Sequence, residues 1–284
     1  MFFGNIKVQD SLNCILAHTI VINNNKINKG TIITKKHKKI FIDNDIKNIV
    51  GARLSKNDFH EDDAANIVAS KFRNSDLALE KAYTGRANIL ANKSGLLIID
   101  EQKINQFNKI SDNITIATLN NNSNVKKGEM IATIKIISFA VQEKFINLIK
   151  KSYLKKSLSI HSYINKKCAL ILTHHNKENI KLNAISEKRI KSRLKNLNCN
   201  LDLISKCEHD SIIISKKINS LLKKNVNLIL ILGSSAIVDI KDKIPEAIKI
   251  SNGSIIRFGM PVDPGNLLLL GNINKTSIIG LPGC

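Results

Sequence analysis

The chain has 284 residues, of which 43% are hydrophobic, enough to form the core of one large domain or of two ordinary ones. It carries 44 Lys and Arg against 23 Asp and Glu, which gives a formal net charge of +21. This composition excludes a disordered basic tail, and no apolar run reaches the roughly 18 residues of a membrane-spanning helix.

The high positive charge would attract nucleic acid or a small polyanion. Lys, Asn and Ile, however, are abundant in every kind of segment, as nucleotide bias in a genome would produce, and aromatic residues make up only 4% of the chain. The basic residues do not gather on one aromatic-lined segment, so we expect no sequence-specific binding of nucleic acid. The N-terminal MFFGNIKVQD lacks the regions of a signal peptide, and we expect a cytoplasmic protein without a membrane partner.

The cysteines are scattered along the chain and form no Cys-x-x-Cys pair. They are Cys14, Cys168, Cys199, Cys207 and Cys284. A disulfide framework or a structural zinc site would need tighter spacing. We therefore expect reduced and mostly buried thiols.

The first 150 residues alternate short apolar stretches with Asn-, Lys- and Gly-rich turns, a pattern that predicts many short strands. We expect strands over 14–22, 95–100 and 113–119, a turn over 23–30, two strands joined through a Gly-containing bend over 125–137, and helices over 61–73 and near 102–108. The region 1–150 is therefore predicted to have an α+β fold.

The clearest seam in the sequence is polar, strongly basic and poor in periodicity. It runs from Ile149 to Lys167 and reads IKKSYLKKSLSIHSYINKK. We expect a basic linker over 151–167, followed by a separate domain over 168–284.

After this seam, strands and helices alternate with short connections, which indicates an α/β domain of three layers (α/β/α) with a mostly parallel sheet. Two continuous apolar runs, Cys168–Leu172 and Asn227–Leu232, suit strands that are covered on both faces. Other strands are expected over 201–205, 254–258, 266–270 and 277–279, and helices around 185–197, after a cap at 210 or 211, and over 242–250.

The strongest candidate site is the strand-to-turn segment Leu228–Ala247, LILILGSSAIVDIKDKIPEA. In such sheets ligands bind beyond the carboxyl ends of the strands, where turns and helix N-termini expose unpaired amides. A buried strand ends at Gly233, where the missing side chain lets a ligand approach the backbone. Ser234 and Ser235 supply hydroxyls and amides that suit phosphate oxygens.

Two carboxylates, Asp239 and Asp242, follow this turn before the next helix. A carboxylate pair beside a phosphate cradle is expected if Mg²⁺ bridges them, which makes both residues candidate metal ligands and catalytic groups. The alternative from spacing alone is an ordinary strand-to-helix turn in which Asp242 caps the helix.

Two further turns have the composition of a site. The segment Phe258–Gly271, FGMPVDPGNLLLLG, places prolines and glycines around Asp263, which makes a stiff loop before a leucine-rich strand, although hairpin turns also use Pro and Gly. The segment Ile278–Cys284, IIGLPGC, is a strand that runs into another Gly- and Pro-containing turn. We expect the three turns to converge on the edge of one pocket.

These three segments resemble those of molybdopterin-binding proteins. GSSAIVDIKDKIPEA is similar to the Gly-Gly-Thr/Ser-Gly…Asp…Pro-Glu-Ala signature of the MoaB/Mog-type fold. MPVDPGNLLLLG and IIGLPGC are similar to the Pro-Gly-Lys-Pro and Gly-Leu-Pro-Gly-Asn turns of the molybdopterin molybdotransferases. Closer still is the molybdopterin-binding module fused to a cytidylyltransferase in some bacterial proteins, which also carries segments like ILAHTI, YTGRANIL, GLLIID and MIATIKIISFAV.

The resemblance covers almost the whole chain and implies a protein of molybdenum cofactor biosynthesis. Its ligand would be molybdopterin, bound for molybdate insertion or for activation by a nucleotide (ATP or CTP) with Mg²⁺, as in a transferase. The pterin dithiolene and its phosphate would lie near Gly233–Ser235, with Asp239 and Asp242 as acidic partners. The residues that would border this site are Asp263, Pro264, Gly265, Asn266, Gly280, Pro282 and Gly283. Members of the family commonly form homo-oligomers.

The turns also depart from the family pattern. Two glycines are replaced by Ser234 and Ala236, the Lys of Pro-Gly-Lys-Pro by Asn266, and the Asn after Leu-Pro-Gly by Cys284. The change at 266 removes a cation from the expected molybdate or phosphate position. These changes favour a second hypothesis, a non-catalytic module that holds molybdopterin and hands it to a separate nucleotidyltransferase or to a molybdoenzyme.

Two signals outside these turns are weaker. Thr84-Gly85-Arg86 could place a guanidinium on a phosphate, although a surface turn is the simpler interpretation. His174-His175 suggests a metal pair, but adjacent residues rarely coordinate one ion. Only His209 and distant histidines could supply further ligands, so we expect a solvated turn at His174-His175.

Overall fold

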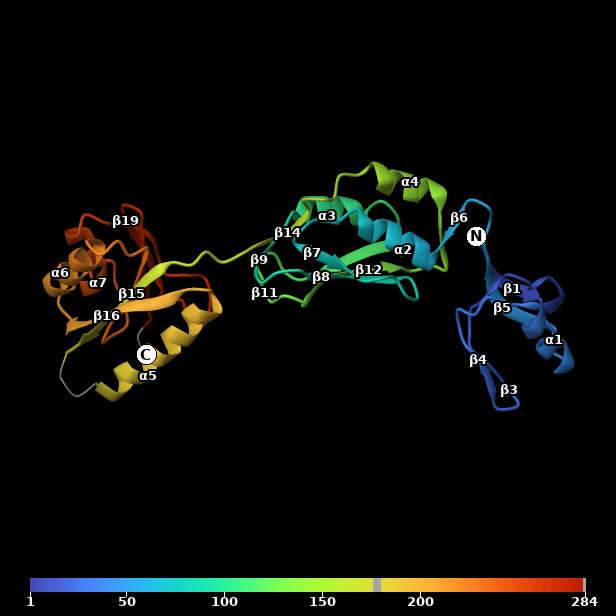
Figure 1. The fold of residues 1–284 in the computed structure, drawn as a ribbon, viewed down its shortest axis with the longest axis horizontal. Helices are drawn as coiled ribbons and strands as arrows, with labels where there is room; N and C mark the ends of the chain where they lie inside the picture. The colour runs from blue at the N-terminus through green and yellow to red at the C-terminus, as the bar shows by residue number, and fades with distance from the viewer. Residues whose placement is uncertain (176–179, 283–284) are drawn as a thin grey trace. The chain divides into compact units, whose positions relative to one another are not determined.

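The structure is a computed structural model that describes residues 1–175 and 180–282 (Figure 1). It consists of two compact units, unit 1 over Met1–Ser162 and unit 2 over Tyr163–Cys284. Within the described residues, none of the helices combines the length and the apolar composition that a membrane crossing requires.

Unit 1 has an α+β fold of short strands and helices. Its helices are α1 (Lys35–Asp43), α2 (Glu61–Ser70), α3 (Glu101–Asn108) and α4 (Glu143–Lys151), with a 3-10 turn η1 (Val8–Asp10). Its strands are β1 (Phe2–Lys7), β2 (Ile15–Leu16), β3 (Ile20–Ile22), β4 (Asn25–Ile27), β5 (Asn48–Arg53), β6 (Asp58–His60), β7 (Leu77–Leu79), β8 (Arg86–Ala91), β9 (Gly95–Ile99), β10 (Ile114–Thr118), β11 (Asn124–Val125), β12 (Met130–Ile136), β13 (Ala140–Gln142) and β14 (Leu158–His161).

The largest sheet of unit 1 has the strand order β10-β12-β8-β7, and all its pairings are antiparallel. Helix α2 lies on this sheet because its small apolar residues recur on one side; Ala64, Ala65 and Val68 are all fully buried there. Three acidic residues in the first turn of α2 face the positive end of the helix dipole, which favours a helix start at Glu61. The predicted helix over 61–73 is therefore confirmed.

The predicted turn over 23–30 contains a strand. Strand β4 pairs with β3 in a two-stranded hairpin, with Ile20 opposite Ile27, and the chain reverses at Asn23 and Asn24, which both have positive φ. Asn tolerates that backbone conformation, so an Asn-rich stretch signals the turn but hides the short strand beside it.

Helices α1 and α4 were not predicted from the sequence. Helix α1 begins with lysines rather than with the acidic residues that suit a helix N-terminus, and it is held instead by a capping box between Thr34 and His37. Helix α4 buries Ile146 and Ile149, but its last turn is part of the basic seam.

Part of the segment predicted as a linker, 151–167, is an ordered strand. Strand β14 pairs antiparallel with β9, with Leu158 opposite Ile99 and Ile160 opposite Leu97. Leu158 and Ile160 point into the core of unit 1, while the residues that alternate with them are polar. That alternation of period two is too short to stand out among lysines.

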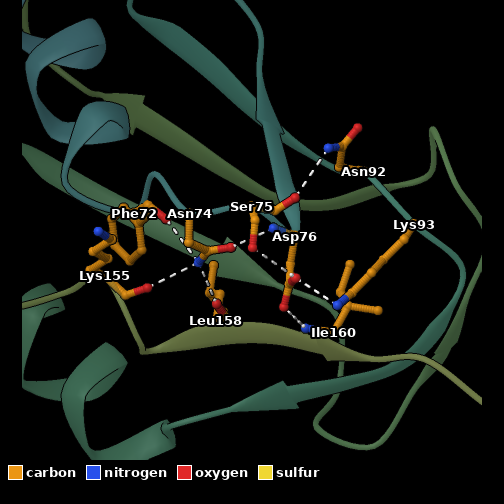
Figure 2. Close-up of polar contacts among 9 residues, drawn as sticks. All are labelled: Phe72, Asn74, Ser75, Asp76, Asn92, Lys93, Lys155, Leu158 and Ile160. Carbon is orange, nitrogen blue, oxygen red and sulfur yellow. Dashed lines mark hydrogen bonds and ion pairs between the residues drawn. The ribbon is translucent and has the colours of Figure 1, made fainter.

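A pair of polar side chains fastens this strand to the turn before β7 (Figure 2). The Asn74 amide donates to the carbonyls of Lys155 and Leu158, both at 2.9 Å, and its Oδ1 accepts from the Asp76 N–H at 2.9 Å. Asp76 Oδ2 accepts from the N–H of Ile160 at 2.9 Å. Asp76 Oδ1 lies 2.6 Å from Lys93 Nζ.

Unit 2 is built around a six-stranded sheet with the order β16-β15-β17-β20-β19-β18. Its strands are β15 (Lys167–His174), β16 (Asn200–Glu208), β17 (Leu228–Leu232), β18 (Ser254–Phe258), β19 (Leu269–Ile273) and β20 (Thr276–Leu281). Its helices are α5 (Ile180–Asn196), α6 (Ser211–Leu222) and α7 (Lys243–Ile250).

The pattern of buried residues in β15 explains the three layers of unit 2. Cys168, Leu170 and Leu172 pack with residues of α5 on one face, whereas Ala169 and Ile171 pack with α6 and α7 on the other. Figure 1 shows α5 on the opposite side of the sheet from α6 and α7. A strand that is covered on both faces exposes neither face to solvent, which is why CALIL is a continuous apolar run.

The predicted α/β fold is confirmed, with a mostly parallel sheet. The pairs β16–β15, β15–β17 and β17–β20 are parallel, whereas β19 is antiparallel to both β20 and β18. Asp210 caps α6, and Pro245 lies in the first turn of α7, as expected. Asp242 caps α7, which was the alternative to its predicted role as a metal ligand. The strand predicted over 266–270 lies further along, at Leu269–Ile273, because Asn266 and its neighbours form the turn before it.

The cysteines described by the structure are buried, as expected; these are Cys14, Cys168, Cys199 and Cys207. Burial, together with the neighbouring Cys199, raises the pKa of the Cys168 thiol to about 12. Cys284 lies outside the described residues.

Asn74→Ala should destabilise unit 1, because the change leaves the Lys155 and Leu158 carbonyls without their donor. We expect a loss of about 1–3 kcal/mol in the free energy of unfolding, measured by urea denaturation of the full chain. Asn105→Ala, at an exposed position of α3, is the matched control and should leave the denaturation midpoint nearly unchanged. Equal midpoints for the two variants would contradict the fastening role of Asn74.

Asp76 should contribute to stability in a pH-dependent way. Burial opposes its ionisation, but the hydrogen bonds from Lys93 and from the Ile160 N–H outweigh burial and lower its pKa. Because the folded pKa lies below that of the unfolded chain, this stabilisation is present above about pH 4 and is lost as the pH falls through the folded pKa.

We therefore expect Asp76→Asn to be less stable than the wild type at neutral pH and to show a shallower loss of stability on acidification. Urea denaturation at several pH values between neutrality and pH 3 measures this difference. The control is Asp112→Asn, at an exposed position of the same unit, which should follow the wild-type curve.

Candidate functional site

The turns predicted to form a site lie at one edge of the sheet in unit 2. Strands β15, β16, β17 and β20 are parallel, so the turns that follow them leave the same edge. Strand β18 runs in the same direction, since both β18 and β20 are antiparallel to β19. The β18–β19 turn that contains Asp263 therefore lies at this edge as well, which we call the carboxyl edge.

Neighbouring strands bring two of these turns close together. Leu232, the residue before Gly233, is the register partner of Leu281, the residue before Pro282. Gly280 is in turn the partner of Leu269, the first residue after the Asp263 turn. The Asp263 turn joins β18 to β19, so the strand order places it one to two strands beyond β20 and two to three beyond β17.

Gly233 and Gly280 make room for other parts of the chain. A Cβ on Gly233 would lie 2.6 Å from the Ser235 carbonyl oxygen and 3.1 Å from Ile244 Cδ1. A Cβ on Gly280 would lie 2.6 Å from Ile237 Cδ1. A side chain at Gly233 would therefore crowd the backbone of its own turn, and one at Gly280 would displace Ile237.

The hydroxyl of Thr173, near the end of β15, organises the Gly233 turn. Thr173 is 3% exposed, and its Oγ1 accepts a hydrogen bond from the Ser234 N–H at 2.9 Å. The same oxygen lies 2.8 Å from His209 Nδ1. Residue 173 points to the side of α6 and α7 because it shares a strand face with Ala169 and Ile171.

His209, which follows β16, is the residue that sequence reasoning missed. Its N–H donates to the His174 carbonyl at 3.0 Å, and its ring lies edge-on to that of His175 with centroids 5.0 Å apart. Its Nε2 lies 3.5 Å from Ser235 Oγ. His209 is half-buried, whereas His175, for which a solvated turn was expected together with His174, is exposed. The position of His209 after a strand was a usable signal, because it places the residue at the carboxyl edge.

The surroundings of His209 disfavour its protonation. Burial lowers the pKa of the imidazole most, and His175 and Lys243 lower it further, while Asp242 acts in the opposite direction. The net result is a pKa below the ordinary value of about 6.5.

Asp242 and Asp239 are already engaged with the backbone. Asp242 Oδ1 accepts from the Lys243 N–H at 2.7 Å, and its Oδ2 accepts from the Val238 N–H at 3.3 Å. Asp239 Oδ1 accepts from the Lys241 N–H at 2.7 Å. Residues 1–175 and 180–282 contain no group of three His, Cys, Asp or Glu side chains arranged to hold a metal ion. Both carboxylates therefore stabilise the turn and the start of α7.

The Asp263 turn is exposed and held by its own backbone. Gly259 donates to the Leu268 carbonyl, Met260 to that of Asn266, and Leu268 to that of Gly265. The side chains of Asp263, Pro264 and Asn266 are exposed, and Pro282 is half-buried. Gly283, predicted to border the site, lies outside the described residues.

The turn Thr84-Gly85-Arg86 belongs to unit 1 and is held against α2. The Gly85 N–H donates to Asp62 Oδ1 at 2.6 Å, and the Ala82 N–H donates to Asn66 Oδ1 at 2.9 Å. Unit 1 also contains cavities of about 310 Å³, one lined by Leu12, Lys35, Lys38, Lys39 and Ile42 and another beside α3. Neither cavity includes a residue predicted for the site.

Comparisons with known proteins give matches among solved structures. No family model matches the chain, and no curated protein matches it. A protein from Corynebacterium diphtheriae assigned to molybdenum cofactor biosynthesis is 15% identical with a TM-score of 0.33, over 43% of this chain and 84% of that chain. The molybdopterin biosynthesis enzyme MoaB from Thermus thermophilus is 14% identical with a TM-score of 0.31, over 42% of this chain and 82% of that chain. A molybdopterin biosynthesis MoeA protein from Pyrococcus horikoshii is 11% identical with a TM-score of 0.33, over 99% of this chain and 70% of that chain.

Thr173→Val should destabilise unit 2, because the valine keeps the shape of threonine but leaves the Ser234 N–H and His209 Nδ1 without their partner. We expect the free energy of unfolding to fall by about 1–3 kcal/mol in urea denaturation. Thr173→Ser keeps the hydroxyl and should lose clearly less. A valine variant as stable as the serine variant would show that the hydroxyl does not hold the turn.

The pKa of His209 should rise when His175 is replaced by Asn, because a neighbour that can become positively charged is removed. Imidazole resonances followed by NMR against pH measure this shift. In the wild type, the low pKa means that the folded chain binds the His209 proton less readily than the unfolded chain. This contribution to stability is therefore present above about pH 6.5 and is lost as the pH falls through the folded pKa. A His209 pKa that does not change in the variant would contradict the assigned contact.

Proposed function

We propose that the chain binds molybdopterin at the carboxyl edge of unit 2 and acts in molybdenum cofactor biosynthesis. The observation that carries this proposal is the position of the three turns that resemble molybdopterin-binding segments. They come from stretches up to 50 residues apart, around Gly233, Asp263 and Pro282, and all leave the same edge of one sheet. The carboxyl edge is where such sheets bind ligands.

The Gly233 turn has the chemistry to receive the anionic end of the ligand. It lies between the end of β17 and the N-terminus of α7, where the helix dipole favours negative charge. The exposed Ser235 hydroxyl and the His209 ring lie beside it. The formal charge of the chain, +21, adds a long-range attraction for an anion.

Binding is tested by isothermal titration of the full chain with molybdopterin, with and without Mg²⁺ and nucleotide. Ser235→Glu places a negative charge at the turn, so we expect the affinity to fall by about tenfold or more, because the ligand phosphate is repelled. Ser277→Glu is the matched control, since it adds the same charge at an exposed position near the opposite end of β20. No binding to the wild type, or equal losses in both variants, would overturn the proposed site.

A second candidate role is favoured by the contacts of Asp239 and Asp242. Their oxygens accept backbone N–H groups in the turn and at the start of α7, as structural caps do. This supports a module that holds molybdopterin and passes it to a separate nucleotidyltransferase, rather than one that consumes a nucleotide itself. The replacement of the family lysine by Asn266 points the same way.

The two roles differ in nucleotide consumption. A holding module binds molybdopterin without turnover, so incubation with ATP or CTP and Mg²⁺ should leave the nucleotide intact. Nucleotide-dependent product formation by the purified chain, abolished in both Asp239→Ala and Asp242→Ala, would instead establish the transferase role. Chromatography of the nucleotide pool measures the outcome directly.

A further inference from the structure

His209, which lies outside the family-like segments, belongs to a chain of polar side chains that reaches one of them. The chain runs from Thr173 Oγ1 to His209 Nδ1 at 2.8 Å and from His209 Nε2 to Ser235 Oγ at 3.5 Å. Its members come from the ends of β15, β16 and β17, which are adjacent in the sheet. The imidazole therefore lies against the Gly233 turn, and a Cβ on Gly233 would be 3.4 Å from His209 Cε1.

The hydrogen-bond capacity of Thr173 determines which ring nitrogen is available. Its oxygen accepts the Ser234 N–H, and its proton can go to His209 Nδ1 or, at the longer distance of 3.4 Å, to the Leu232 carbonyl. In either arrangement Nδ1 is occupied by Thr173, as donor or as acceptor. When Thr173 donates to Nδ1, the neutral ring carries its proton on Nε2. Nε2 has one contact of 3.5 Å, at the outer limit of a hydrogen bond, so Nε2–H can donate to a better acceptor.

A second observation at this turn indicates a missing partner. The Ser234 hydroxyl oxygen is buried and has no hydrogen-bond partner within the part of the chain that the structure describes. Buried polar groups are nearly always paired, and leaving one unpaired costs about 1–3 kcal/mol. An oxygen of a bound anion would supply the acceptor that this hydroxyl lacks.

The charged groups around His209 also suit an anion. His175, from the end of β15, and Lys243, from the start of α7, both act on the ring with positive charge or the capacity for it. Asp242 is the acidic neighbour, and its oxygens already accept two backbone N–H groups. A phosphate or similar oxyanion at the turn would be attracted by the first two groups and would gain a charge-assisted hydrogen bond from the imidazole.

We propose that His209 contacts the anionic group of the ligand at the Gly233–Ser235 turn through Nε2–H, and that Thr173 is the positioning residue that holds its ring. This inference rests on the proposed function for the identity of the full ligand. The chemical class that the site recognises is a phosphate monoester, with the imidazole Nε2–H and the Ser234 hydroxyl as donors.

The test observes the His209 ring directly. Long-range ¹H–¹⁵N NMR spectra of the full chain resolve Nδ1 and Nε2, and His209 is assigned by its disappearance in His209→Gln. Titration with inorganic phosphate, and separately with molybdopterin, should shift the Nε2 resonance of His209 and leave those of exposed histidines such as His18 in place. An Nε2 resonance that stays in place in both titrations overturns the proposal.

Affinity measurements on variants supply the second readout. His209→Gln and His209→Ala should weaken phosphate or molybdopterin binding by about tenfold, the loss of one charge-assisted hydrogen bond. His18→Gln, in unit 1, should bind like the wild type. Thr173→Val should weaken binding, and Thr173→Ser should restore most of it, which separates positioning of the ring from general loss of packing. Unfolding curves recorded on each variant identify any that fail to fold, and only folded variants are compared.

The failure of this inference can be distinguished from the failure of the proposed function. If molybdopterin binds the wild type but neither the Nε2 shift nor the variant losses occur, the role of His209 is wrong and the binding function stands. If molybdopterin does not bind but phosphate shifts the Nε2 resonance and the variants lose phosphate affinity, the oxyanion contact stands and the proposed ligand is wrong.

Discussion

The parallel pairing of β15 with β17 is the interaction on which the rest of unit 2 depends. Both strands are covered on both faces, by α5 on one side and by α6 and α7 on the other, so nearly all of their side chains are apolar and alternate between two cores. This burial supplies most of the stabilisation and also fixes the register of the sheet. Each strand direction, and therefore the edge from which each turn leaves, follows from that register.

Thr173 is the point at which this apolar packing changes into a polar site. It follows the buried run of β15 on the face of α6 and α7, and a hydroxyl in that position must be hydrogen-bonded. Its partners are the Ser234 N–H and His209 Nδ1, so one buried oxygen holds both the Gly233 turn and the imidazole beside it. Much of the geometry of the candidate site is thus a consequence of satisfying a single polar atom in the core.

The carboxyl edge combines features that favour binding with features that do not favour catalysis. The N-terminus of α7, the exposed Ser235 and a histidine whose Nε2 has only a long contact are suited to hold an oxyanion. The carboxylates nearby are used to close the turn and to cap α7. A protein that retains an oxygen-sensitive pterin without transforming it would need the first set of groups and could use the second set for structure alone.

The sequence by itself determined the α/β class of unit 2, its buried strands, a helix cap at 210 or 211 and the turn at Gly233, because these depend on periodicity and local residue type. It left two roles open for Asp242, metal ligand or helix cap, and the structure shows the cap contact. It did not reveal β4 or β14, whose short alternations are concealed by Asn and Lys. Only the tertiary structure decided that His209 meets Thr173 and Ser235, which are 36 and 26 residues away along the chain. That meeting requires β16 to lie beside β15 and β15 beside β17, and strand order results from packing of the whole sheet, which no local pattern encodes.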